Sequence, residues 1–251
     1  MKAKLRKTLV FSVLVLVLLG FIGFVEKQSA DKRVNSIHVK VNPIADVYFV
    51  EEKDLLSRLQ TEFPMLNTGI LINQVNLDQM EEKVSNHPFV KNAEVFSDLK
   101  GNILVEIDQH KPMARIVRPM AADGYISTEG VILPTSPKYT TRVLTLEGNY
   151  AERLLLEERL GEEHDGLMNL IEFIEGDEFW RAQITGLEIN RKNDIRMYQQ
   201  VGKQVIEFGA AEHIEEKFKK ISLFYEEILP TKGWNTYSRV NVKYKDQIIC
   251  E

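Results

Sequence analysis

The chain has 251 residues, of which 44% are hydrophobic, and its formal net charge is −5 at pH 7. Acidic and basic residues are interspersed, so the sequence offers no broad cationic surface, and we do not expect it to bind nucleic acid. The single cysteine, Cys250, cannot form an intramolecular disulfide, so the core must be held by apolar burial.

Residues 8–25 form an uninterrupted apolar run that follows a basic leader at residues 1–7. Such a run spans about 27 Å as a helix, which predicts a single transmembrane helix with the leader in the cytoplasm and the remaining chain outside it. A cleaved signal peptide is the alternative, but its apolar core has about 7–15 residues, and Gln28 stands where a small residue is expected. We expect an uncleaved anchor followed by a stalk at residues 26–35.

The next segment predicts a small α+β domain at residues 36–112. Apolar and polar residues alternate in the expected strands, whereas the expected helices have apolar residues on one face. Asn76 and Gln79 have the spacing of a capping box, and Pro88 marks the end of the second helix. The order is strand 36–41, helix 51–60, helix 76–87, strand 90–97 and strand 102–109, with both helices on one face of the sheet.

From residue 113 to 251 the sequence predicts a second domain, a mixed or antiparallel sheet with flanking helices. The expected strands are 113–117, 124–126, 131–133, 141–146, 184–190, 195–199, 205–208 and 237–244, the last one extended by 247–249. Helical patterns cover residues 154–174, with a break at 161–166, and residues 214–228, where Pro230 is expected to end the helix. Phe218, Phe224 and Tyr225 are expected in the core.

The sequence contains no recognisable catalytic or cofactor motif, and we expect a protein that is not an enzyme and has no cofactor or metal. The five histidines are dispersed. Acidic neighbours surround His164, and this segment is interpreted as a solvated loop, with a cation site as the alternative. For Trp180 and Trp234, an interface and a domain edge both remain open.

Four segments together resemble the bacterial division proteins of the FtsQ/DivIB family. They are residues 87–95 (HPFVKNAEV), 109–114 (QHKPMA), 123–131 (DGYISTEGV) and the tail 240–248 (VNVKYKDQI). Three residues depart from the usual motifs: His110 and Asn241 each stand where an acid is usual, and Lys243 stands where an arginine is usual. Any ion pair that the family makes at Lys243 should therefore be reshaped here, because lysine lacks the planar fork of arginine.

The resemblance implies a POTRA domain next to the inner membrane, followed by a β domain. It also implies binding to bitopic division proteins of the FtsB and FtsL type, contact with the septal peptidoglycan synthase complex, and a role in localising and regulating septal peptidoglycan synthesis. Two alternatives remain open, an anchored cell-envelope hydrolase and a POTRA-containing component of outer-membrane assembly.

We predict that the partner site lies on the last strand and the helix before it, because a terminal strand is often an open edge that can pair with another chain. In the family, the corresponding strand receives a segment of FtsB. Tyr244 is expected to pack against the partner, Lys243 to pair with a partner carboxylate and Ile248 to flank them; Val242 and Tyr237 complete the predicted site. The alternative is that Tyr244 merely caps the sheet.

Overall fold

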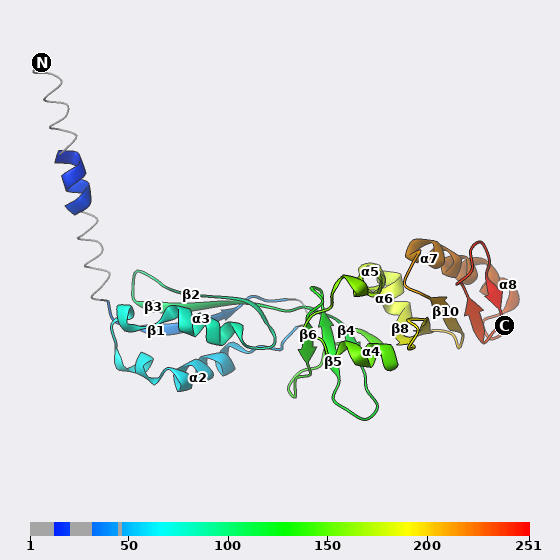
Figure 1. Cartoon of the computed structure of the whole chain (residues 1–251), viewed down its shortest axis with the longest axis horizontal. Helices are drawn as coiled ribbons and strands as arrows, with labels where there is room; N and C mark the ends of the chain where they lie inside the picture. The colour runs from blue at the N-terminus through cyan, green and yellow to red at the C-terminus, as the bar shows by residue number, and fades with distance from the viewer. Residues whose placement is uncertain (1–12, 21–31, 45–46) are drawn as a thin grey trace, which may run out of the picture. The chain divides into compact units, whose positions relative to one another are not determined.

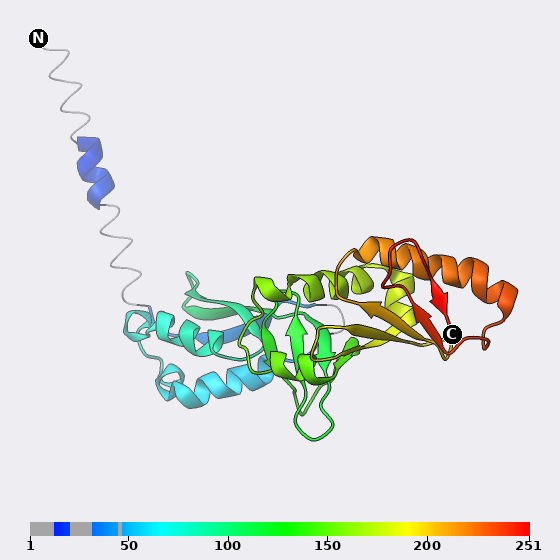
Figure 2. The ribbon, with the colours of Figure 1, turned by 45° about the vertical axis from the view of Figure 1, so that its right-hand side comes forward.

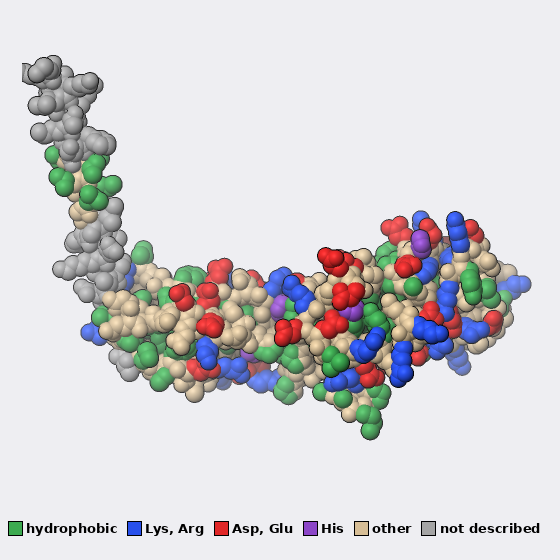
Figure 3. Space-filling view, viewed as in Figure 1, with side chains coloured by type: hydrophobic (Ala, Val, Ile, Leu, Met, Phe, Trp, Pro, Cys, Tyr) green, Lys and Arg blue, Asp and Glu red, His purple; other side chains and the backbone are tan. Residues whose placement is uncertain are grey.

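The computed structural model describes residues 13–20, 32–44 and 47–251, which form two compact units (Figure 1). The first unit ends at Gln109, and the second continues from His110 to Glu251. Residues 47–49 cluster with the second unit. Each unit has a sheet of its own, and acidic and basic side chains are interspersed over both of them (Figure 3).

The predicted transmembrane helix lies mostly outside the described residues. Residues 13–20 are helical and exposed. The rest of the expected span, the basic leader and residues 26–31 of the stalk belong to the part that the structure does not describe. Within the described residues, no helix has both the length and the apolar character needed to cross a bilayer.

The first unit has the predicted order of strand, helix, helix, strand and strand. Strand β3 (Asn102–Gln109) lies between β1 (Ser36–Val41), which is parallel to it, and β2 (Val90–Ser97), which is antiparallel. Helix α2 (Glu52–Glu62) packs against β1, and α3 (Leu77–Ser85) packs against β2. Two 3₁₀ turns, η1 (Pro64–Thr68) and η2 (Ile72–Gln74), connect the helices. This arrangement confirms the predicted α+β fold.

Local sequence signals explain the boundaries in this unit. The Asn76 side chain accepts a hydrogen bond of 2.9 Å from the backbone N–H of Gln79, so Asn76 caps α3 as its spacing predicts. Gly101 closes the hairpin between β2 and β3 with φ of 91°, a conformation that few other residues adopt. Ile103, Val105 and Ile107 of β3 are buried, and they form the centre of the small core.

The second unit is built on a nine-stranded mixed sheet in the order β12-β11-β10-β9-β8-β7-β4-β5-β6. The strands are β4 (Pro112–Ile116), β5 (Gly124–Ser127), β6 (Ile132–Pro134), β7 (Leu144–Glu147), β8 (Ile184–Ile189), β9 (Ile195–Gln199), β10 (Val205–Gly209), β11 (Arg239–Asn241) and β12 (Ile249–Cys250). Strand β4 pairs parallel with β7 and antiparallel with β5, which makes the sheet mixed as expected.

Helices of this unit pack into one apolar cluster with the sheet. They are α4 (Asn149–Leu154), α5 (Asp165–Gly176), α6 (Glu178–Gln183), α7 (Ile214–Leu223), η4 (Phe224–Ile228) and α8 (Leu229–Lys232), whereas the 3₁₀ turn η3 (Glu162–His164) precedes α5 and contributes no residue to the cluster. Helix α7 runs along the sheet (Figure 2), and its Phe218 ring lies 5.7 Å from the Phe208 ring of β10. Phe218 and Phe224 are buried, as predicted, and Trp180 also belongs to the core.

The prediction of a helix from residue 154 was wrong in its first half. Helix α4 ends at Leu154, and the chain then leaves the helical path to pair with residues 130–132, at the start of β6. The backbone N–H of Ile132 donates to the Glu158 carbonyl at 3.0 Å, and the Leu160 N–H donates to the Gly130 carbonyl at 2.9 Å. Tertiary pairing thus overrides the helical propensity of this leucine-rich segment.

The helical segment that begins with α7 continues past Pro230, where it was expected to end. Residues Phe224–Ile228 form a π-helical turn, and Pro230 lies in the first turn of α8. A proline inside a continuous helix donates no N–H to the turn before it, and the π-helical turn directly before α8 is the irregularity that accommodates Pro230.

The last predicted strand, residues 237–244, is also shorter than expected. Strand β11 covers only Arg239–Asn241, and residues 249–250 do not extend it but return beside it as the antiparallel strand β12. Asp246, with φ of 57°, lies in the turn that reverses the chain. The expected terminal edge strand is therefore an inner strand of the sheet, paired with β10 on one side and β12 on the other.

Candidate partner-binding edge of the second sheet

The two edges of the nine-stranded sheet differ in how they are protected. At the β6 edge, residues 158–160, here called the covering segment, form a bridge between Arg159 and Val131 and hydrogen bonds to the backbone around it. Strand β12 forms the opposite edge. It is two residues long and contains no proline and no charged residue, two of the devices that prevent an edge from pairing with another chain.

The hydrogen bonds of β12 show which of its backbone groups face outward. Arg239 and Glu251 exchange two backbone hydrogen bonds of 3.0 Å. In an antiparallel ladder, the residue next to such a pair directs its N–H and C=O away from the partner strand. Cys250, which lies opposite Val240, therefore presents its N–H and C=O on the side away from β11.

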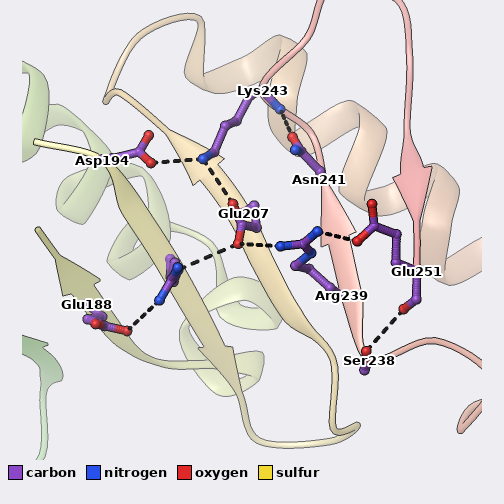
Figure 4. A network of polar contacts seen from close by, with 9 residues as sticks. Glu188, Asp194, Glu207, Ser238, Arg239, Asn241, Lys243 and Glu251 are labelled. Carbon is purple, nitrogen blue, oxygen red and sulfur yellow. Dashed lines mark hydrogen bonds and ion pairs between the residues drawn. The ribbon is translucent and has the colours of Figure 1, made fainter. Parts of the chain in front are cut away.

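A ladder of charged side chains crosses the strands toward this edge (Figure 4). Glu207 of β10 is the centre of the ladder, and its residue is only 8% exposed. Its carboxylate lies 3.5 Å from Arg196 of β9 and 3.7 Å from Arg239 of β11. Arg196 also lies 3.7 Å from Glu188, and Arg239 pairs with Glu251, the residue that follows β12. The charges alternate in sign, so each pair joins one strand to the next.

Lys243 adds a further cation to the ladder. Its Nζ atom lies 2.8 Å from Asp194 and 2.9 Å from Glu207. Burial by itself lowers the pKa of Lys243, but the hydrogen bonds to the two carboxylates outweigh it, and the net result is a raised pKa. The predicted partner of Lys243 was a carboxylate on another protein, whereas the structure gives it two carboxylates of its own chain.

Lys220 of α7 holds the segment that follows β11. Its Nζ atom donates to the carbonyl oxygen of Val242 at 2.5 Å and to that of Tyr244 at 2.6 Å. The Val242 N–H donates to the Glu207 carbonyl at 3.1 Å, and the Val242 side chain is 0% exposed. Its side chain is thus part of the core and cannot contact a partner, which corrects the inclusion of Val242 in the predicted site.

The other predicted residues are more accessible. Tyr244 is 53% exposed. Ile248 is half-buried and lines a groove of about 580 Å³ between α7 and residues 245–248, together with Lys219 and Leu223. Tyr237 lies before β11, half-buried against the core, with its ring 6.4 Å from that of Phe224.

The predicted site residues therefore differ in their exposure. Tyr244 and Ile248 lie at its surface, Lys243 and Tyr237 support it, and Val242 is buried. Strand β12 and Lys220 were missed. The capacity of Lys220 to bind two carbonyl groups depends on contacts 22 and 24 residues along the chain, for which the sequence has no local signal.

These features define a class of protein: a small α+β domain followed by a mixed β domain with one open sheet edge. Comparison with protein families gives the same division, since residues 32–108 match a POTRA-like domain and residues 111–251 match the model described as FtsQ/DivIB, C-terminal related. The second match covers more than half of the chain. The chain therefore belongs to the FtsQ/DivIB family. No match was found among the curated proteins.

Family membership confirms the resemblance that the four motifs indicated. The FtsQ/DivIB family is a non-catalytic family of cell division proteins associated with the membrane and the division septum, so the chain has a role in cell division. The departures from the motifs have partners of their own: His110 Nδ1 lies 3.2 Å from Glu129, and the Asn241 side chain accepts a 3.0 Å hydrogen bond from the Lys243 N–H.

Proposed function

We propose that the chain is a non-enzymatic, single-pass inner-membrane protein of the division septum, which binds bitopic proteins of the FtsB/FtsL type at the β12 edge. Through these partners it helps to localise and regulate septal peptidoglycan synthesis. The apolar run at residues 8–25 and the basic leader support the membrane anchor, with the leader in the cytoplasm.

The open edge of β12 is the observation that carries the binding proposal. The opposite edge is covered by the chain's own backbone, whereas Cys250 directs its N–H and C=O away from the sheet. A partner segment in extended conformation can add to such an edge as a further strand. Tyr244 is half exposed, and Leu223 and Ile248 are the apolar residues of a groove that is otherwise lined by charged and polar side chains, so these three can contact side chains of that strand.

A proline substitution at residue 250 tests this proposal. Cys250→Pro removes the outward N–H but leaves the pairing of Arg239 with Glu251 in place, because the lost N–H does not face β11. Cys250→Ser is the matched control, since it changes the side chain and keeps the N–H. The full-length variants would be co-expressed with the FtsB-type and FtsL-type proteins of the same organism and recovered by affinity purification.

We expect Cys250→Pro to lose the partners and Cys250→Ser to retain them, with the tryptophan fluorescence of both folded proteins unchanged. Tyr244→Ala should weaken recovery without unfolding the chain. Full recovery of both partners with folded Cys250→Pro would refute strand addition at this edge.

A further inference from the structure

His164 lies in a second cluster of polar side chains, in the segment between α4 and α5. The acidic neighbours of His164 predicted a solvated loop, but His164 is only 7% exposed. Its Nδ1 atom lies 2.9 Å from the Tyr150 hydroxyl, and its Nε2 atom lies 3.1 Å from a carboxylate oxygen of Glu157. A carboxylate oxygen of Glu163 lies 3.8 Å from the same nitrogen. One imidazole and two carboxylates therefore converge on one point.

The spacing of these atoms is compatible with a metal ion between them. One donor atom from each of the three residues lies within 4.8 Å of the others. Around a tetrahedral zinc ion, with bonds of about 2.1 Å, neighbouring ligand atoms are roughly 3.4 Å apart. The two distances from Nε2, 3.1 Å and 3.8 Å, lie on either side of that value.

Tyr150 provides the outer contact that a metal-binding histidine needs. When Nε2 binds a metal, Nδ1 carries the proton and donates it to a neighbouring acceptor, which fixes the orientation of the ring. The Tyr150 oxygen is at hydrogen-bond distance from Nδ1 and lies outside the set of three ligands. The buried ring is thus held with Nε2 directed at the carboxylates.

The backbone at Gly161 leaves room for the third ligand. A Cβ atom at this position would lie 2.5 Å from a carboxylate oxygen of Glu163. The Glu163 side chain is 71% exposed, yet its carboxylate folds back over Gly161 toward His164. The absence of a side chain at residue 161 permits this arrangement.

We propose that His164, Glu157 and Glu163 bind one divalent transition-metal ion such as zinc. An imidazole with two carboxylates suits zinc or a similar first-row metal, whereas calcium and magnesium prefer oxygen ligands alone. Glu157 and Glu163 lie on either side of the covering segment in the chain. The ion therefore fastens the backbone that covers the β6 edge.

Calorimetric titration of the untagged, metal-stripped full-length chain with zinc tests the proposal. Glu157→Gln and Glu163→Gln each remove one ligand, and Glu162→Gln is the matched control because this exposed neighbour contributes no atom to the cluster. Tyr150→Phe keeps all three ligands but removes the acceptor of the Nδ1 proton.

We expect one zinc ion per wild-type chain and, at saturation, a rise of roughly 5 °C in the melting temperature detected by tryptophan fluorescence. Each ligand variant and Tyr150→Phe should weaken zinc binding about 10-fold or more, while Glu162→Gln should bind as the wild type does. Absence of stoichiometric zinc binding would overturn the proposal, and so would binding that persists unchanged in Glu157→Gln and Glu163→Gln.

Discussion

The Nζ atom of Lys243 lies 2.9 Å from Oε2 of Glu207, and this ion pair joins the segment after β11 to strand β10. Glu207 is largely buried, and a buried carboxylate is costly unless cations and hydrogen-bond donors surround it. Arg196, Arg239 and Lys243 meet this requirement from three different segments. The same pairs therefore stabilise the charge and hold β11 in place next to β12.

Removal of the Lys243 ammonium group should loosen this region. We expect Lys243→Ala to lower the free energy of unfolding by about 1–2 kcal/mol, since Glu207 retains its two arginines and Asp194 is partly exposed. Lys203→Ala, at an exposed lysine of the same unit, is the control. Both tryptophans belong to the second unit, so urea unfolding followed by tryptophan fluorescence measures it selectively. An unchanged midpoint for Lys243→Ala would mean that the arginines alone satisfy Glu207.

Val242 and Tyr244 should respond differently to the same truncation. Val242→Ala removes two buried methyl groups and should cost about 2 kcal/mol of unfolding free energy. Tyr244→Ala removes a side chain that is about half exposed and should change the free energy by less than about 1 kcal/mol. The same fluorescence-detected urea titration compares the two variants. Equal losses would indicate that Tyr244 supports the sheet, which was the alternative considered for this residue.

Local signals in the sequence were sufficient for the hairpin of β2 and β3. Ile103, Val105 and Ile107 recur at every second position and define one buried face, and Gly101 supplies the turn. The cap of α3 at Asn76 depends on a contact three residues away and was predicted for the same reason. Where the contacts that set an element's boundary lie within a few residues of each other, the sequence pattern was enough to predict that boundary.

Boundaries that depend on distant contacts were not predictable in this way. The residues after Leu154 have helical propensity, but pairing of residues 158–160 with residues 130–132 draws them out of the helix. The return of the chain as β12 needs Asp246 in a left-handed conformation, and no glycine marks that turn. Lys243 pairs with Asp194, which lies 49 residues earlier in the chain. The periodicity of a single segment carries no information about such a partner.

Phe89 should be a structural residue of the first unit. Its side chain is buried, and it follows Pro88 at the point where the chain enters β2. We expect Phe89→Ala to lower the free energy of unfolding by about 3–5 kcal/mol. Phe96→Ala, at an exposed ring of the same strand, should cost less than about 1 kcal/mol. Because the first unit contains no tryptophan, circular dichroism would be compared with fluorescence to isolate its transition. Equal effects of the two variants would show that the Phe89 ring contributes little to the core.

The stability of the first unit should fall as the pH is lowered through the titration range of His87. Burial, followed by the nearby positive charge of Arg58, lowers the pKa of His87 from its ordinary value of 6.5. In addition, the Phe89 N–H lies 3.4 Å from Nδ1 of His87 as a donor, and a protonated ring cannot accept this hydrogen bond.

The direction of the effect follows from the lowered pKa. Below pH 6.5 the unfolded chain binds the proton more readily than the folded chain, so stability is lost as the pH falls and is not affected well above that value. The loss stops growing once the pH is below the pKa of the folded state. His87→Gln removes the titrating group and should therefore lose less stability than the wild type between about pH 7.5 and pH 5.5. Arg58→Gln removes one of the two causes and should lie between them. Melting curves by circular dichroism at the two pH values measure these differences, and an equal loss in wild type and His87→Gln would assign the pH dependence to other groups.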